Sequence, residues 1–175
     1  MSLLQDLPLD RLTPSRLWGA IDAETRRLAA RCLYDPERDD VGGRAEADAA
    51  IAAALRFRAA AVRRLPVDKR VDYLTRAVRP DASLATALLR ALHLPLRSEM
   101  LGTFLDALGI PQQGGVIDTD DELNAPGGEE LVAAVGALRE GFPADEVDIY
   151  LASLLSMEPE FWGALVEVVR PGSGP

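Results

Sequence analysis

The sequence predicts an all-α protein, a compact bundle of about eight short amphipathic helices arranged as antiparallel hairpins. Apolar residues recur at helical spacing along most of the 175-residue chain, and no segment shows the alternation typical of a strand. Apolar-Pro steps at Leu65-Pro66, Leu94-Pro95 and Phe142-Pro143 divide the chain into helix-length pieces. They do so because proline disfavours helical geometry in the residue before it.

The first helix is expected to start at Thr13-Pro14, with Thr as the N-cap and Pro in the first turn. It runs to a polar loop at 34–43, and its apolar side consists of Leu17, Trp18, Ile21, Leu28 and Cys32. A second helix, rich in Ala and Arg, is expected over 44–64. A third covers 66–78, with an apolar stripe of Val67, Val71, Leu74 and Val78.

Asp81 is expected to cap a fourth helix, which ends near Leu94-Pro95. A fifth extends to Leu108, where Gly109 is a natural residue to end it. Three more helices are expected at 129–140, 143–157 and 159–169. These elements indicate either one domain overall or four parts. The four parts are an N-terminal helical subdomain with a basic hairpin (1–108), an acidic Gly/Pro linker (109–128), an acidic C-terminal helical subdomain (129–170) and a disordered tail (171–175).

Two stretches raise the question of an internal duplication. Residues 65–78, LPVDKRVDYLTRAV, and 142–155, FPADEVDIYLASLL, share a Pro, an Asp and a Tyr-Leu pair in register. The spacing of the apolar-Pro steps brackets the roughly 40 residues of HEAT-like repeats. A short HEAT-like solenoid is therefore the alternative to the compact bundle, and the shared Tyr-Leu pair predicts the same packing role in both stretches.

Composition limits the location and the chemistry. The N-terminus lacks the basic and apolar regions of a signal peptide, and no apolar run reaches the ~20 residues that span a bilayer. A single cysteine excludes an intramolecular disulfide, so we expect a cytoplasmic protein. The net charge of −9 argues against nonspecific nucleic-acid binding by the chain as a whole.

The residues indicate no catalytic, metal or cofactor site. The only cysteine, Cys32, is predicted to be a buried structural thiol, and the only histidine, His93, is predicted to lie at a helix end. One His and one Cys cannot form a closed zinc shell. The acidic segment 118–129 has the spacing of a calcium loop, but Leu123 stands where the sharp turn requires glycine. A small enzyme with an Arg/Asp/Glu/Tyr site is the least favoured function.

Charge is distributed unevenly along the chain. Residues 56–97 carry 10 basic and 3 acidic side chains, whereas residues 98–175 carry 2 basic and 15 acidic ones. Lys69, Asp72, Arg76 and Arg79 fall at helical spacing on one stripe, where Asp72 is placed to pair with Arg76. The predicted binding residues for an anionic partner are Arg56, Arg63, Arg64, Lys69, Arg70, Arg76 and Arg79.

This pattern predicts a non-catalytic helical interaction or adaptor protein. Its partner would be an acidic protein surface, or the acidic half of another copy in a homo-oligomer held by opposite charges. The alternative is an anion- or nucleic-acid-binding regulator that uses the same residues. Nucleic acid is less favoured, because Phe57 and Tyr73 are the only aromatic residues of the basic segment and form no stacking platform. The structural alternative is a solvated face neutralised by Asp68 and Asp72.

Overall fold

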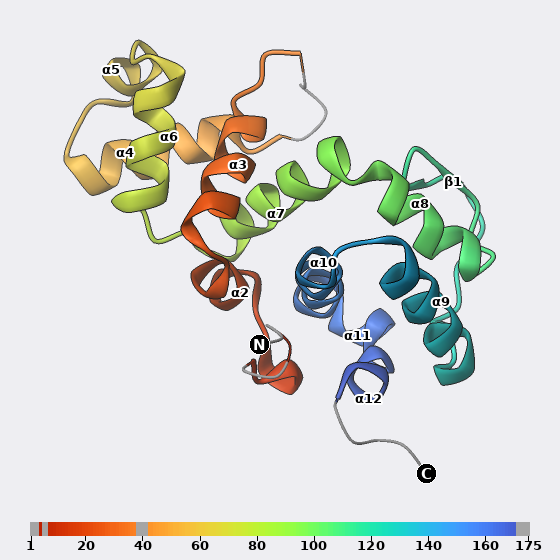
Figure 1. The fold of residues 1–175 in the computed structure, drawn as a ribbon. Helices are drawn as coiled ribbons and strands as arrows, with labels where there is room; N and C mark the ends of the chain where they lie inside the picture. The colour runs from red at the N-terminus through yellow and green to blue at the C-terminus, as the bar shows by residue number, and fades with distance from the viewer. Residues whose placement is uncertain (1–3, 5–6, 38–41, 171–175) are drawn as a thin grey trace. The chain divides into compact units, whose positions relative to one another are not determined.

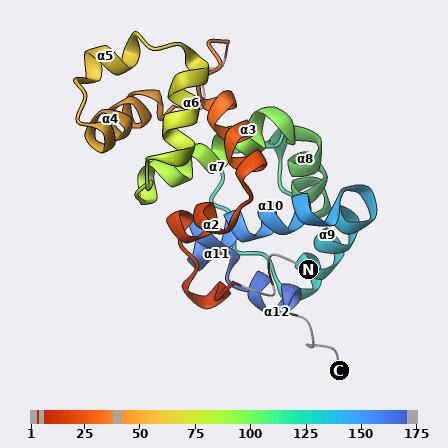
Figure 2. The same cartoon turned by 60° about the vertical axis from the view of Figure 1, so that its left-hand side comes forward.

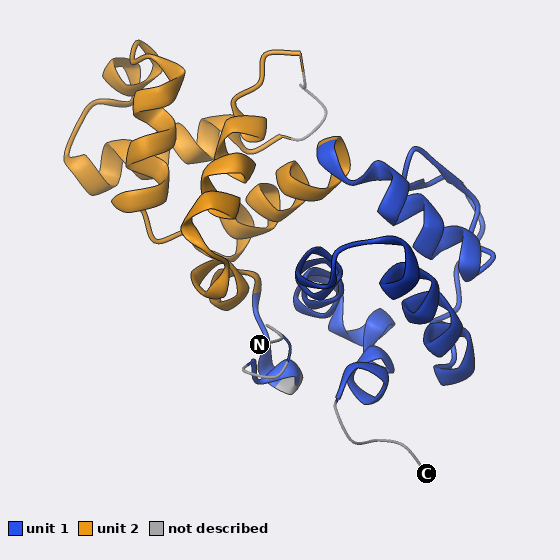
Figure 3. Ribbon diagram, viewed as in Figure 1, with its two compact units in different colours: residues 1–13, 96–175 blue, residues 14–95 orange. Residues whose placement is uncertain are grey.

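The computed structural model describes residue 4 and residues 7–37 and 42–170. Helices dominate this part of the chain, which confirms the all-α fold class (Figure 1). The predicted disordered tail, 171–175, lies outside the described residues. The chain forms two compact units, one of residues 1–13 and 96–175 and one of residues 14–95 (Figure 3). The segment 109–128, predicted to separate two subdomains, lies within unit 1.

Unit 2, residues 14–95, is built from short helices around an aliphatic core. Its helices are α2 (Pro14–Ala20), α3 (Ala23–Leu33), α4 (Arg44–Leu55), α5 (Ala59–Arg63), α6 (Val67–Arg76) and nearly all of α7 (Ala82–Leu96). Helix α3 packs along α6, and α4 contacts both α5 and α6 (Figures 1 and 2). Leu33, Val71, Leu74 and Leu88 are fully buried.

Two expected helices of unit 2 are interrupted, so these continuous-helix predictions were wrong. The helix over 14–33 breaks because Asp22 is extended and accepts hydrogen bonds from the Glu24 and Thr25 N–H groups, each at 2.9 Å, as the N-cap of α3. The helix over 44–64 breaks because Arg56 is left-handed, with φ 55°. Its N–H closes α4 on the carbonyls of Ala52 and Ala53.

Several core assignments in unit 2 also differ from the expected stripes. Leu28 is 44% exposed and Val67 39% exposed, so neither belongs to the core. Cys32 is only partly buried, which corrects its prediction as a buried thiol. His93 lies in the last turn of α7, as predicted, and is only 3% exposed. Helical spacing identifies one face of a helix correctly but does not show where along that face the neighbouring helix ends.

Unit 1 is organised around one central helix. Its elements are the 3-10 helix η1 (Leu9–Arg11), α8 (Ser98–Ala107), β1 (Gln112–Gln113), β2 (Val116–Ile117), α9 (Gly128–Gly141), α10 (Ala144–Met157), α11 (Pro159–Trp162) and α12 (Leu165–Val169). Helix α10 contacts η1, α9, α11 and α12. The rings of Phe104 and Tyr150 meet edge to face with their centres 5.5 Å apart, and the centre of the Trp162 ring lies 5.6 Å from that of Phe104.

The helix expected over 159–169 is divided at Gly163 and Ala164 into α11 and α12. With the two interruptions in unit 2, this gives eleven α-helices in the described residues instead of about eight. All three breaks shorten a helix without changing the fold class. Glycine at the break is consistent with its low helix propensity.

The segment 109–128 contains a small antiparallel hairpin of two-residue strands, which no alternation in the sequence indicates. Gln112 pairs with Ile117 and Gln113 with Val116. Gly115 in the turn has φ 82°, and a Cβ atom there would lie 2.7 Å from the Leu101 Cβ and 2.9 Å from the Ser98 carbonyl oxygen. The hairpin is therefore packed directly on α8, and only glycine fits at this position.

The two similar stretches start alike and pack differently. Pro66 and Pro143 are the N-cap residues of α6 and α10, as the apolar-Pro steps predict. Leu74 and Leu151 are both fully buried, but Tyr150 is 4% exposed and Tyr73 is only partly buried. The third step differs, because Pro95 lies inside α7 and α8 begins at Ser98. Only part of the predicted equivalence therefore holds.

Candidate functional site

Six of the seven predicted binding residues are exposed in unit 2. They lie at the end of α4, at the end of α5, on α6 and just after α6. We call this set the cationic surface, which comprises Arg56, Arg63, Arg64, Lys69, Arg76 and Arg79. Within the described residues none of these six side chains forms a hydrogen bond or an ion pair. Their charges are therefore available to a partner.

The seventh predicted residue, Arg70, belongs to a buried polar network instead. Its guanidinium lies 3.4 Å from the Asp48 carboxylate and 4.4 Å from the centre of the Tyr34 ring. The Tyr34 hydroxyl donates a hydrogen bond to Asp48 at 2.9 Å. Burial, and then the Asp48 charge, raise the pKa of Tyr34 well above its usual value, so Tyr34 stays a neutral donor. Arg70 thus neutralises a buried carboxylate of its own unit.

Helix α3 contributes two arginines to the site that no pattern in the sequence predicts. Arg31 pairs with Asp68 at 3.1 Å, and Arg27 pairs with Asp72. Each step of four residues down α3 matches a step of four residues up α6, as antiparallel helices require. The expected pair between Asp72 and Arg76 is not formed, because Arg27 occupies Asp72. Arg27 and Asp72 are 45 residues apart in the sequence, so no local pattern indicates that they pair.

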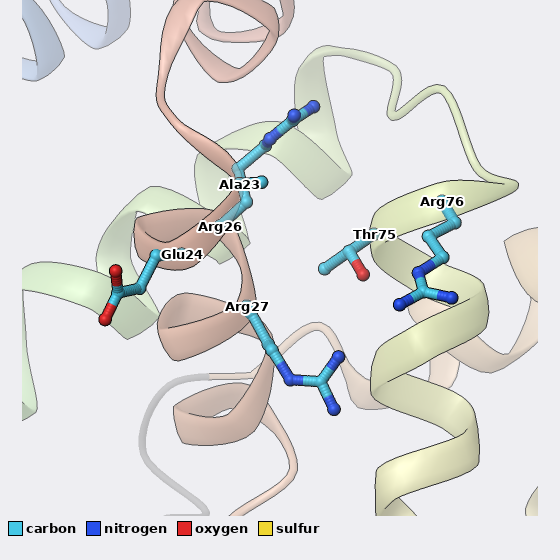
Figure 4. A pocket seen from close by; sticks show the side chains of 6 residues that line it. All are labelled: Ala23, Glu24, Arg26, Arg27, Thr75 and Arg76. Carbon is cyan, nitrogen blue, oxygen red and sulfur yellow. The ribbon is translucent and has the colours of Figure 1, made fainter.

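A cavity of about 380 Å³ lies beyond this second ion pair, between α3 and α6. We call it the α3–α6 cavity; its lining residues are Ala23, Glu24, Arg26, Arg27, Thr75 and Arg76. In Figure 4 the guanidinium groups of Arg27 and Arg76 point toward one another, while Glu24 and Arg26 extend away from the gap between them. The Thr75 hydroxyl donates to the Val71 carbonyl at 2.9 Å, so arginine N–H groups are the donors available here.

The charged side chains around Asp72 are mostly positive. The hydrogen bond from Arg27 lowers the pKa of the Asp72 carboxyl, and the charges of Arg27, Arg76 and Lys69 lower it further. Three cations thus act on one carboxylate, and Arg76 and Lys69 have no carboxylate of their own within ion-pair distance in the described structure. This arrangement favours the binding of a further anionic group.

Unit 1 has a different hollow, of about 620 Å³, between α9 and α12. Apolar side chains line it together with Glu129 and Glu167, and Val132 is 59% exposed there. The described residues that line this hollow include no nucleophile and no cation. Across the described part of the chain, no three His, Cys, Asp or Glu side chains come together in a geometry suited to a metal ion.

The chain matches no protein-family model, and no curated protein or solved structure is significantly similar to it. No helix in residues 7–37 or 42–170 is both long and apolar enough to cross a bilayer. The function must therefore be inferred from the geometry and charge of the site.

Proposed function

We propose that this protein is a non-catalytic helical interaction module that binds an acidic protein surface through the cationic surface of unit 2. The observation that carries the proposal is the group of six exposed cations without ion pairs. Evolved folds commonly neutralise such groups with neighbouring acids, as Asp48, Asp68 and Asp72 do for other arginines of this unit. Exposed cations of this kind accelerate encounter with a partner of opposite charge.

The charge of each unit supports this proposal. Residues 14–95 carry 15 basic and 11 acidic side chains, a net charge of +4, and the rest of the chain carries 4 basic and 17 acidic ones, a net charge of −13. The positive charge proposed to bind the partner therefore lies on one unit of a protein that is acidic as a whole. Such a protein repels an acidic surface unless unit 2 faces it. Only one orientation of the protein can therefore bind an acidic partner. The acidic unit of a second copy is one surface that fits.

One observation favours a second candidate, a nucleic-acid-binding regulator. Phe57 is 48% exposed in the connection between α4 and α5, and Arg56 and Arg58 flank it in the sequence. An exposed aromatic ring between two arginines can stack on a base while the arginines contact phosphates. A single ring is a small platform, so this candidate ranks second.

Fluorescence anisotropy can decide between the two candidates. The full-length protein is titrated into a labelled polyglutamate peptide and into a labelled single-stranded oligonucleotide, each at about 50 and about 300 mM salt. We expect the peptide to bind at low salt, and the quadruple variant R63E/R64E/K69E/R76E to lose that binding. The control variant R90E/R139E reverses two exposed arginines outside the cationic surface and should bind as the unmodified protein does.

Preferential binding of the oligonucleotide, lost in Phe57→Ala, would support the second candidate and overturn the first. Absence of binding to both probes at about 50 mM salt would exclude both, because electrostatic contacts are strongest there. A substantial loss in the control as well, about half of that in the quadruple variant as its smaller change in net charge implies, would show that net charge alone, and not the cationic surface, determines binding.

A further inference from the structure

We infer that the α3–α6 cavity is a binding site for a single carboxylate, held between Arg27 and Arg76. The inference deepens the proposed function, because it rests on an acidic protein as the partner and names the place where one of its aspartate or glutamate side chains would bind.

The ion pairs between α3 and α6 form a regular series that stops one step early. The series runs Arg31 with Asp68 and then Arg27 with Asp72. One further step of four residues places Ala23 opposite Arg76. Alanine has no charge and does not reach across, so among the described residues Arg76 forms no ion pair, and the α3–α6 cavity lies at this position. The missing member of the series is a carboxylate on the α3 side.

The geometry of the two arginines suits that missing group. Asp72 fixes the Arg27 guanidinium, which therefore loses little freedom when a ligand binds. Figure 4 shows the Arg76 guanidinium facing it across the cavity. A carboxylate placed between them would accept hydrogen bonds from the N–H groups of both arginines. Charge-assisted hydrogen bonds to arginine are among the strong ones, and planar carboxylates match the arginine fork.

The acidic neighbours indicate a monoanion rather than a phosphate dianion. Asp72 is hydrogen-bonded to Arg27, and Glu24 lines the same cavity. Both cancel part of the positive potential in the cavity, so a second charge on the ligand gains little attraction while its removal from water costs more. A free carboxylate should bind weakly for the same reason, whereas one presented by a peptide gains from further contacts with the cationic surface.

NMR titration of the full-length protein tests the inference. The probes are acetate, inorganic phosphate and a short glutamate peptide, and the readout is the backbone amide signals of 23–27 and 75–76 together with the arginine Nε–H signals. We expect the peptide and acetate to shift these signals, with phosphate acting no more strongly than acetate. Arg76→Gln should weaken peptide binding by up to about fivefold, as the loss of one exposed ion pair implies. The exposed control Arg90→Gln should not.

Ala23→Glu supplies the missing carboxylate within the chain and should abolish the acetate-induced shifts while leaving the protein folded. Peptide binding with signal changes only near Arg56, Arg63 and Arg64 would overturn this inference and leave the proposed function standing. Acetate-induced shifts at 23–27 without any peptide binding would support the site and count against the proposed function. Stronger binding of phosphate than of acetate would overturn the assignment to a carboxylate.

Discussion

Asp48 is a buried carboxylate whose charge is met by two different side chains. Only 5% of it is exposed, and it accepts a hydrogen bond from Tyr34 while the Arg70 guanidinium lies over the Tyr34 ring. A buried carboxylate is costly unless both its charge and its hydrogen bonds are satisfied. This network explains why Arg70, alone among the predicted binding residues, is not available to a partner.

Tyr34→Phe should therefore destabilise the protein. The change removes one hydrogen bond to a buried charge and should lower the free energy of unfolding by about 1–3 kcal/mol. Urea denaturation measures the effect. The matched control is Tyr73→Phe, because Tyr73 is partly exposed and its hydroxyl has no partner among the described residues; its change should stay within about 0.5 kcal/mol. Equal effects of the two substitutions would contradict the role given to Asp48.

Asp22 provides a pH-dependent contribution to stability. Its carboxylate accepts the Thr25 hydroxyl at 2.6 Å and the N–H groups of Glu24 and Thr25, and these bonds, led by the Thr25 hydroxyl, lower its pKa. A lowered carboxyl pKa stabilises the fold above the unfolded-state pKa, and this stability is lost as pH falls through the native pKa. At neutral pH, Asp22→Ala should cost about 1 kcal/mol.

Asp22→Asn separates the cap from the charge, because asparagine caps helices as well as aspartate but does not titrate. The variant should be nearly as stable as the unmodified protein at pH 7 and should lose less stability between about pH 5 and pH 2. Thermal unfolding across that pH range measures the difference. Parallel curves for the two proteins would show that the Asp22 charge contributes nothing.

Among the elements, the antiparallel pair α3 and α6 carries both the fold of unit 2 and the candidate site. Completing its series of ion pairs should stabilise it. Ala23→Glu is expected to raise the free energy of unfolding by about 0.2–1 kcal/mol through a pair with Arg76, the usual range for exposed pairs. In the Arg76→Gln background the gain should fall, and a double-mutant cycle isolates the pairwise part. A coupling energy of zero would show that residue 23 does not reach Arg76.

The element boundaries show which parts of the fold a sequence can predict. Helices α6, α7 and α10 begin where Pro66, Asp81 and Pro143 indicate, because caps and proline steps act locally. The break at Arg56 carries no such signal. A left-handed residue that ends a helix is usually glycine or asparagine, and arginine adopts that geometry here at a cost of about 1 kcal/mol that tertiary packing must offset.

At the scale of the whole molecule, the candidate site likewise contains residues that the sequence could predict and residues that it could not. Lys69 and Arg76 could be predicted, because their spacing on one helix places them on a common exposed stripe. Arg27 could not, because it joins them only through the packing of α3 against α6. The α3–α6 cavity likewise depends on a small residue at Ala23, which becomes informative only when Arg76 lies opposite.

The charge of the two units predicts how the protein behaves in concentrated solution. Unit 2 has a net charge of +4 and unit 1 a net charge of −13, so unit 2 of one copy attracts unit 1 of another. We expect sedimentation velocity to show reversible self-association at about 20 mM salt and its loss at about 300 mM, because the Debye length shortens several-fold over that range. R63E/R64E/K69E/R76E should sediment as a monomer at both salt concentrations.

Two observations would contradict this last prediction. An identical sedimentation coefficient for the unmodified protein at both salt concentrations would mean that repulsion between the acidic units outweighs the attraction of the cationic surface. Self-association that persists in the quadruple variant would place the contact elsewhere, with the apolar hollow beside Val132 as the first surface to test by Val132→Asp. Opposite net charge brings two copies together only if the six exposed cations of unit 2 make the contact themselves.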